Sequence, residues 1–113
     1  MPSLGASTAA QDVDQLTGLF RLLSDPTRLS ILLRLVDGER NVSSLCDELG
    51  LPQPTVSHHL GLLRLNNVIG NRRKGKQVFY ALNGVVNLQG DAMEIGLEHF
   101  TVRIGARATE PIA

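Results

Sequence analysis

Apolar residues recur at steps of three and four over most of the first 65 positions of this chain. In an α-helix this spacing gathers apolar side chains on one face, so the pattern predicts a series of amphipathic helices. An Asp-Pro pair precedes the second helix, where the carboxylate can act as a cap and proline fits the first turn. Asn41 or Ser43 can cap the third helix, and Gly50 can end it. The predicted helices cover residues 12–23, 26–36 and 42–49, with a fourth that begins at Pro54.

A very short connection around Pro52 joins the third predicted helix to the fourth. In the fourth helix the period places Val56, Leu60 and Leu63 on the buried stripe, with His59 beside it as a partly buried packing residue. Two helices joined so tightly, the second with a hydrogen-bonding outer face, predict a helix-turn-helix. The outer face carries Thr55, Ser57, His58, Gly61 and Arg64.

The period changes after residue 67. Residues 68–69 and 78–82 are rich in strand-forming types, and they flank the basic segment 72–77, in which Gly75 suits a tight turn. This pattern predicts a β-hairpin with a basic tip, a wing. The predicted fold class is therefore mainly α (α+β), a winged helix-turn-helix with the element order α-α-α-α-β-β-α. The last helix would be capped by Asn83 and would carry Val86, Met93, Leu97, Phe100 and Ile104 at helical spacing.

The chain has 113 residues, which suits one domain, and we assign that domain to residues 12–104 with flexible tails at 1–11 and 105–113. The fractions of hydrophobic residues, 42%, and of charged residues, 19%, are typical of soluble globular proteins. No apolar run reaches the roughly 18 residues of a membrane span, and the first residues do not form a secretory signal. The single cysteine, Cys46, cannot form an internal disulfide, which fits a reducing compartment. We therefore expect a cytoplasmic protein with no membrane partner.

The net charge is zero, with eleven basic and eleven acidic residues, but the charges are segregated along the chain. Residues 1–48 and 91–113 are both net acidic, whereas residues 49–90 hold five basic side chains and no acidic one. Such segregation favours one positive surface that binds a polyanion, although a solvated charge cluster would give the same count.

Three segments of the chain resemble the ArsR–SmtB family of winged helix-turn-helix repressors. They are Ser24–Leu32, Gln53–Leu60 and Arg72–Leu82, within a similarity that runs from Leu16 to Leu82. The resemblance implies a homodimer, assembled through its first and last helices, that binds double-stranded operator DNA with dyad symmetry. Many members of the family release DNA when a metal ion, a metalloid or an oxidant reaches a sensing site, so the resemblance also implies an effector.

Helix-turn-helix docking places the first turns of the second helix against base edges in the major groove. On this basis Gln53, Thr55, Ser57 and His58 are the expected base-reading residues. Phosphate contacts set the position of a protein on DNA without reading its sequence. The residues expected to neutralise phosphates, or to enter the neighbouring minor groove, are Arg64 and the wing residues Arg72, Arg73, Lys74 and Lys76.

The expected effector site departs from two patterns that the family is known for. The thiol-rich pattern has closely spaced cysteines in the third helix, where this chain has Asn41 and Ser43 and retains only Cys46. Cys46 lies on the apolar face of its helix, so core packing and redox sensing are both open interpretations. In the last-helix pattern, the early ligand positions fall on Gly84 and Val86, which cannot bind a metal.

A different acidic cluster remains in the predicted last helix. One sector of that helix would hold oxygen ligands and one imidazole, which suit a divalent ion such as Zn²⁺ or Ni²⁺, and a solvated acidic face is the alternative. The candidate metal ligands are Asp91, Glu94, Glu98 and His99.

Three classes of function compete for this sequence. A DNA-binding transcriptional regulator explains the helix-turn-helix and the basic wing together. A winged-helix protein-interaction module would keep the fold and lose DNA binding. A regulator that needs no effector would keep DNA binding and have no metal site. An enzyme is not expected, and neither is a small-molecule substrate, because no catalytic grouping can be assembled from these residues.

Overall fold

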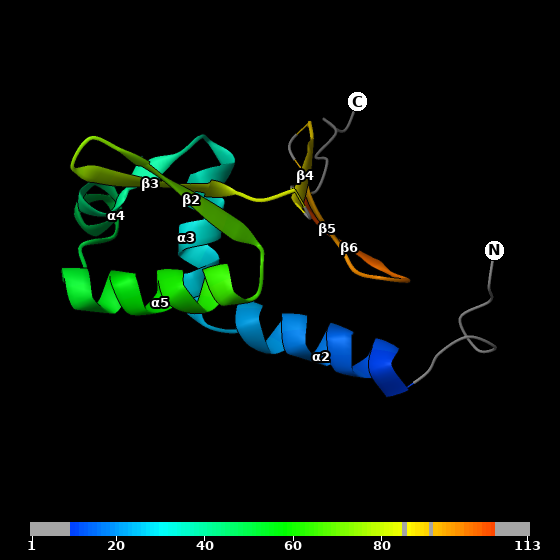
Figure 1. Cartoon of the computed structure of the whole chain (residues 1–113). Coiled ribbons are helices and arrows are strands. Elements are labelled where there is room, and N and C mark those ends of the chain that lie inside the picture. The colour runs from blue at the N-terminus through cyan, green and yellow to red at the C-terminus, as the bar shows by residue number, and fades with distance from the viewer. Residues whose placement is uncertain (1–9, 85, 91, 106–113) are drawn as a thin grey trace, which may run out of the picture.

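The computed structural model describes residues 10–84, 86–90 and 92–105, and it is shown in Figure 1. Most of the two predicted tails, residues 1–9 and 106–113, lie outside the described residues. No helix in the described part of the chain is long and apolar enough to cross a membrane. The helices are α2 (Ala10–Leu23), α3 (Pro26–Val36), α4 (Val42–Leu49) and α5 (Gln53–Leu65). The strands are β1 (Arg40–Asn41), β2 (Ile69–Lys74), β3 (Gln77–Leu82), β4 (Val86–Gln89), β5 (Ala92–Gly96) and β6 (Thr101–Gly105).

The four helices confirm the prediction from apolar spacing, and their ends show why they form. Asp25 caps α3, since its Oδ1 accepts hydrogen bonds from the backbone N–H groups of Thr27 and Arg28 at 2.8 and 3.1 Å. The bond from Arg28 is the main cause that lowers the pKa of Asp25. Asn41 caps α4 through the N–H of Ser44 at 2.8 Å, and Gly50 ends it with a φ of 65°.

The predicted wing is also present, and a short strand that the sequence pattern did not indicate extends it. β2 and β3 pair antiparallel, with Ile69 opposite Leu82 at one end and Lys74 opposite Gln77 at the other. Gly75 has a φ of 63° in the tight turn between the two strands. β1 pairs with the other edge of β3, which gives the sheet order β1-β3-β2. This edge ties the segment before α4 to the base of the wing.

The predicted last helix is wrong: in its place β4, β5 and β6 form a three-stranded antiparallel sheet, in the order β4-β5-β6. The apolar positions of this segment fit a helical period, but glycine costs about 1 kcal/mol in a helix interior, and two glycines lie inside the predicted helix. In β6, half-buried Val102 and Ile104 alternate with exposed residues, which is the period of a strand. Asn83 caps no helix, because its Oδ1 accepts from the N–H of Gly84 in a turn. The two interior glycines are Gly90 and Gly96, and Gly84 and Gly105 border the segment.

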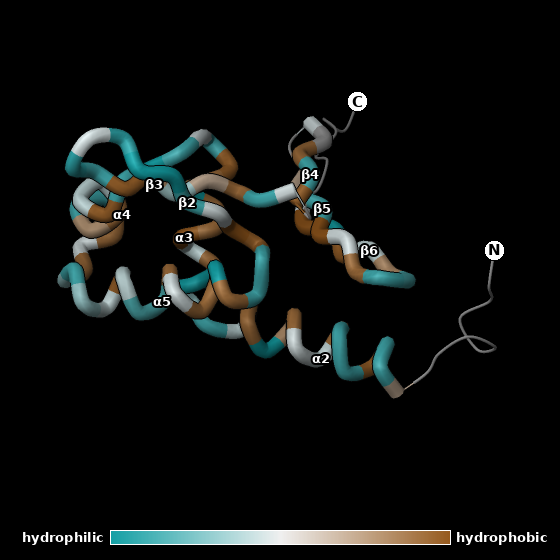
Figure 2. The backbone as a smooth tube through the Cα atoms, in the orientation of Figure 1, coloured by the Kyte–Doolittle hydropathy of each residue, from teal (hydrophilic) through white to brown (hydrophobic). Residues whose placement is uncertain are grey.

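The C-terminal sheet shares one hydrophobic core with the helices. Met93 and Ile95 of β5 are almost completely buried in the same cluster as Leu19 and Leu22 of α2. In Figure 2 hydrophobic positions, in brown, recur along α3, α5 and β5, whereas much of the wing is hydrophilic, in teal. The observed element order is thus α2-α3-β1-α4-α5-β2-β3-β4-β5-β6, in which the helix-turn-helix and the wing lie at the end away from β4–β6 (Figure 1).

Candidate nucleic-acid interface

Helix α5 presents a polar surface because its apolar stripe is fully used by the core. Val56, Leu60 and Leu63 are at most 1% exposed, so the remaining faces of the helix must be solvated or bound by a partner. Thr55 is half-buried at the margin of the stripe. The other predicted contact residues on this helix are exposed: Gln53, Ser57, His58 and Arg64.

His59 is half-buried as predicted, but it also joins two helices through polar contacts. Its Nδ1 lies 3.3 Å from Nη1 of Arg28 and 3.9 Å from Oδ1 of Asp25, the cap of α3. Arg28 in turn donates from Nε to the carbonyl oxygen of Leu22 at 2.7 Å. This cluster fixes α5 against the start of α3, so it sets the orientation of the exposed face of α5.

The wing carries its basic side chains on both of its faces. Arg73, Lys74 and Lys76 are exposed around the turn at Gly75. Successive side chains of a strand point to opposite faces, so Arg73 lies on one face of the hairpin and Lys74 on the other. The tip therefore offers positive charge in more than one direction, as a hairpin that enters or straddles a groove requires.

Arg72 differs from the other wing cations because it is paired within the protein. Its guanidinium forms two hydrogen bonds with the carboxylate of Glu39, one of them from Nε at 3.0 Å, and it stacks 5.5 Å from the ring centre of Phe79. The hydrogen bond from Arg72 lowers the pKa of Glu39, and the same bond raises the pKa of Arg72. Glu39 thus neutralises one of the five cations in the acid-free segment.

A groove that sequence reasoning missed connects the helix-turn-helix to the wing. It has a volume of about 220 Å³ and lies between the start of α4, the start of α5 and the tip of the wing. Ser43, Gln53 and Lys76 line it from these three elements. Asn41, the cap of α4, also lines it and donates from Nδ2 to Oε1 of Gln77 at 3.5 Å. Two helix N-termini and one ammonium group therefore surround the same polar space, an arrangement that favours anions.

Comparison with known proteins identifies the family of this chain. A model described as bacterial regulatory protein, arsR family, matches residues 25–69. The chain is 35% identical over 82 residues to the biofilm growth-associated repressor of Xylella fastidiosa, covering 73% of this chain and 72% of that protein. It is also 35% identical to the transcriptional repressor SdpR of Bacillus subtilis, over 63% of this chain and 79% of that protein. The chain belongs to the ArsR family.

A solved structure supports the same conclusion for the fold of this ArsR-family chain. The homodimeric winged helix-turn-helix DNA-binding domain Mb0332 from Mycobacterium bovis matches with a TM-score of 0.62 and 28% identity, covering 74% of this chain and 77% of that chain. The resemblance drawn from the sequence and the winged helix-turn-helix class are therefore confirmed. The chain is a DNA-binding transcriptional regulator, and its relatives are regulators rather than enzymes.

The lone cysteine of this ArsR-family chain lies beside the helix-turn-helix. Cys46 is half-buried, packs against the hydrophobic core, and lines a small groove with Ser43, Asp47 and Gln53. The packing interpretation of Cys46 accounts for this position, and a role in redox sensing stays a prediction.

The predicted metal ligands that the structure describes do not all come together, because strands stand where the predicted helix would have aligned them. Glu94 on β5 faces Arg103 on β6, with 3.8 Å between Oε2 and Nε. Glu98 and His99 lie in the turn after β5, where both contact α2, and Asp91 lies outside the described residues. Among the residues the structure describes, no group of three or more His, Cys, Asp or Glu side chains is close enough to hold a metal ion.

Proposed function

We propose that this ArsR-family chain acts as a homodimeric repressor that binds a dyad-symmetric operator through α5 and the wing, with residues 12–104 as its DNA-binding and dimerisation domain. The groove shared by α4, α5 and the wing is the observation that carries the proposal. It brings the polar start of the reading helix, Gln53, together with Lys76 of the wing. A phosphate of the DNA backbone bound there would set the position of α5 in the major groove.

The proposed contacts divide into two groups by chemistry. Gln53, Ser57 and His58 lie on the exposed face of α5 and carry donors and acceptors that base edges can pair with. Thr55 joins them from the margin of the buried stripe. The phosphate contacts come from Arg64, Arg73, Lys74 and Lys76, whereas Arg72 serves mainly to brace the wing, because Glu39 already neutralises it.

The dimer is proposed to form through α2. Val13 and Phe20 are 50% and 54% exposed, and their separation of seven residues places them on one face of this helix. The C-terminal sheet, which lies beside α2, takes the place that the sequence assigned to a last helix in the dimer interface. Two copies whose α5 helices lie about 34–36 Å apart would meet successive major grooves on one side of the duplex.

The DNA-binding proposal is tested with a labelled duplex from the region upstream of the chain's own gene, by fluorescence anisotropy over a range of salt concentrations. We expect binding that weakens steeply with salt, because counterions are released from the phosphates. Ser57→Ala and His58→Ala should change the preferred base, whereas Arg73→Ala should weaken binding to all duplexes alike. The absence of binding at low salt, or an affinity that salt does not change, contradicts the proposal.

Release from the operator by an effector is part of the proposed function, and the residues restrict its nature. One thiol cannot supply the several sulfur ligands of a metalloid site, and within the described part of a single chain Glu94, Glu98 and His99 belong to no group of side chains close enough to hold Zn²⁺ or Ni²⁺. A redox signal through Cys46 is tested by Cys46→Ser. If the substituted protein still leaves the operator after addition of peroxide, the thiol is not the sensor.

A further inference from the structure

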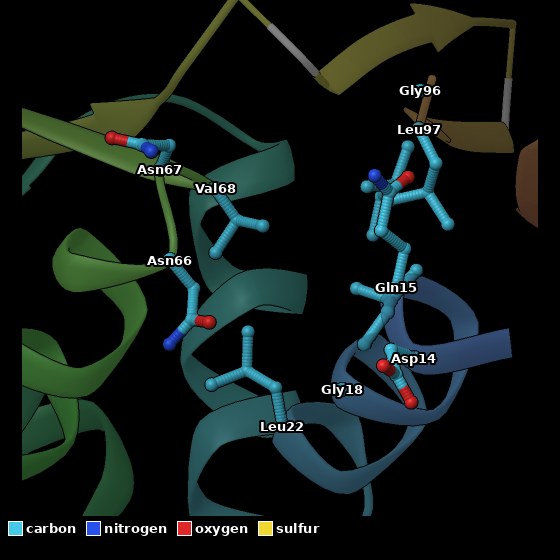
Figure 3. Close-up of a pocket in the computed structure, with 11 residues that line it drawn as sticks. Asp14, Gln15, Gly18, Leu22, Asn66, Asn67, Val68, Gly96 and Leu97 are labelled. Carbon is cyan, nitrogen blue, oxygen red and sulfur yellow. The ribbon is translucent and has the colours of Figure 1, made fainter. Parts of the chain in front are cut away.

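A cavity of about 370 Å³ lies between three elements of the fold that are far apart in the sequence. One wall is α2, another is the turn between α5 and β2, and the third is the end of β5. Figure 3 shows Asn66 and Val68 across the opening from Gln15 and Leu97. The volume is within the range of about 300–1,000 Å³ that is typical of small-molecule sites.

The lining of the cavity combines an apolar base with a few polar groups. Leu19, Leu22 and Ile95 belong to the hydrophobic core and are almost completely buried, so the base of the cavity is apolar. Asp14 and Gln15 bring a carboxylate and an amide from α2, and the α5–β2 turn brings two more amides. No lysine, arginine or histidine is among the described residues that line it, so an anion would meet the carboxylate without any compensating charge.

Gly18 keeps the cavity open on the α2 side. A Cβ atom added at Gly18 would meet no atom within 4 Å, although this position lies in the middle of a helix, where glycine is unfavourable. A larger residue would improve the helix and occupy the cavity, so the chain offers a direct way to fill the site without straining the backbone.

The turn that lines the cavity connects the reading helix to the wing. Asn66 ends α5 and donates from Nδ2 to the carbonyl oxygen of Leu62 at 2.8 Å. Asn67 has a φ of 62°, and its carbonyl oxygen accepts a hydrogen bond from Nδ2 of Asn83 at 3.2 Å, at the end of β3. A molecule in the cavity would therefore contact both α2 and the α5–β2 turn, which sets the angle between α5 and the wing.

We propose that this cavity binds a small amphiphile, neutral or with one positive charge, whose apolar part rests on the leucines and whose polar part meets Asp14 and the amides. Its occupation changes the position of α5 relative to the wing and weakens operator binding. The second statement rests on the proposed function, whereas the first concerns the cavity alone.

The binding test uses the neutral naphthalene dye 6-propionyl-2-(dimethylamino)naphthalene, whose emission shifts to the blue in apolar surroundings. We expect saturable binding to the full chain, and a dissociation constant raised by about tenfold or more in Gly18→Leu, because overfilling a cavity excludes its occupant. Gly84→Leu is the matched control, since that glycine also has open space around it and lies outside the cavity. Equal binding by the Gly18→Leu variant overturns the proposal.

Charge selectivity is tested by displacement of the dye. The cation 2-phenylethylammonium should displace the dye more effectively than the anion 3-phenylpropionate. Asp14→Asn should weaken displacement by the cation by about three- to fivefold, the scale of one exposed ion pair. Stronger displacement by the anion would overturn the proposed ligand class.

If Gly18→Leu fails to fold, the site is located in the unmodified protein by the changes in amide chemical shift when the dye is added. The changes should centre on Gly18, Asn66 and Leu97, and changes centred elsewhere overturn the site.

Coupling to DNA is measured separately, so that the two proposals can fail independently. In the unmodified protein the dye should weaken operator binding by about fivefold or more, the lower end of the usual range of allosteric coupling, and it should have no effect on Gly18→Leu. Dye binding in the cavity with unchanged operator affinity overturns the regulatory statement. An operator that is not bound even without dye contradicts the proposed function and leaves the cavity result intact.

Discussion

The wing hairpin β2–β3 and the C-terminal hairpin β5–β6 are both antiparallel pairs, but they use their side chains in opposite ways. Past Ile69, every residue of β2 except Gly70 is exposed, and the tip is basic. In β5, Met93 and Ile95 are buried in the core, and the charged pair Glu94–Arg103 joins β5 to β6. The wing hairpin therefore presents charges that a partner can bind, whereas the C-terminal hairpin buries apolar surface that stabilises the protein itself.

The wing, which offers charges for DNA binding, and the β5–β6 hairpin, which contributes to stability, therefore lie in different parts of the molecule. The cations of the wing cost little in stability because they project away from the core and remain solvated. The apolar strand β5 is protected from pairing with other chains because β4 and β6 cover both of its edges. A regulator built this way can vary its DNA-binding residues without disturbing the region that joins α2 to the core.

The largest expected effect concerns the apolar hairpin. Ile95→Ala should lower the free energy of unfolding by about 2–5 kcal/mol, because it removes a fully buried side chain and leaves a cavity. Urea denaturation followed by circular dichroism at 222 nm measures this, and the helices should unfold in the same single transition. Leu88→Ala on β4 is the control, since that side chain is 47% exposed. Two separate transitions would show that the sheet does not share the core with the helices.

The helices and the wing could be predicted from the sequence because local signals agree with the tertiary structure. Asp25 and Asn41 are capping residues, and Gly75 suits the turn that it occupies. The C-terminal segment misled the prediction because its apolar residues fit two periods. Gly84, Gly90 and Gly96, which are six residues apart, and the alternation at Val102 and Ile104 were the signals that favoured strands.

The candidate interface was only partly predictable because several of its contacts are not local. Glu39 lies 33 residues before Arg72, so counting charges in a segment could not show that this cation is neutralised. The groove at Lys76 likewise depends on how the wing folds back over the start of α4. Exposure on α5 was predictable, because it follows from the apolar stripe of one helix.

The next largest effect concerns a cation on each hairpin. Arg73→Ala should weaken operator binding by roughly tenfold and lower the dependence of log affinity on log salt by about one, because one phosphate contact is lost. Arg103→Ala removes an exposed arginine from β6, which lies away from the wing (Figure 1), and should leave the affinity unchanged. Fluorescence anisotropy over a salt series measures both. Equal losses in the two variants would contradict the assignment of DNA binding to the wing.

A smaller effect distinguishes the two neighbouring arginines of the wing. Arg72→Ala should weaken binding by only about twofold, because its charge is already neutralised by Glu39 and its loss affects the salt dependence little. Glu39→Gln should strengthen binding to any duplex and steepen the salt dependence, since it releases that charge. If Arg72→Ala proved as harmful as Arg73→Ala, then Arg72 would have to exchange Glu39 for a phosphate when DNA binds.

The smallest expected effect is a pH dependence at the contact between α2 and the apolar hairpin. Nδ1 of His99 lies 2.7 Å from Oδ1 of Asp12, which is 1% exposed, and this hydrogen bond is the main cause that raises the pKa of His99 above 6.5. Because the folded pKa is the higher one, the stabilisation is fully present below the unfolded pKa of about 6.5 and is lost as pH rises through the folded pKa. The free energy of unfolding, measured from about pH 5.5 to 9, should therefore fall over that window, and His99→Gln should remove this part of the decline. His58→Gln, which changes an exposed histidine on α5, should retain it. A pH profile that His99→Gln leaves unchanged would mean that the contact between His99 and Asp12 does not contribute to the stability of the fold.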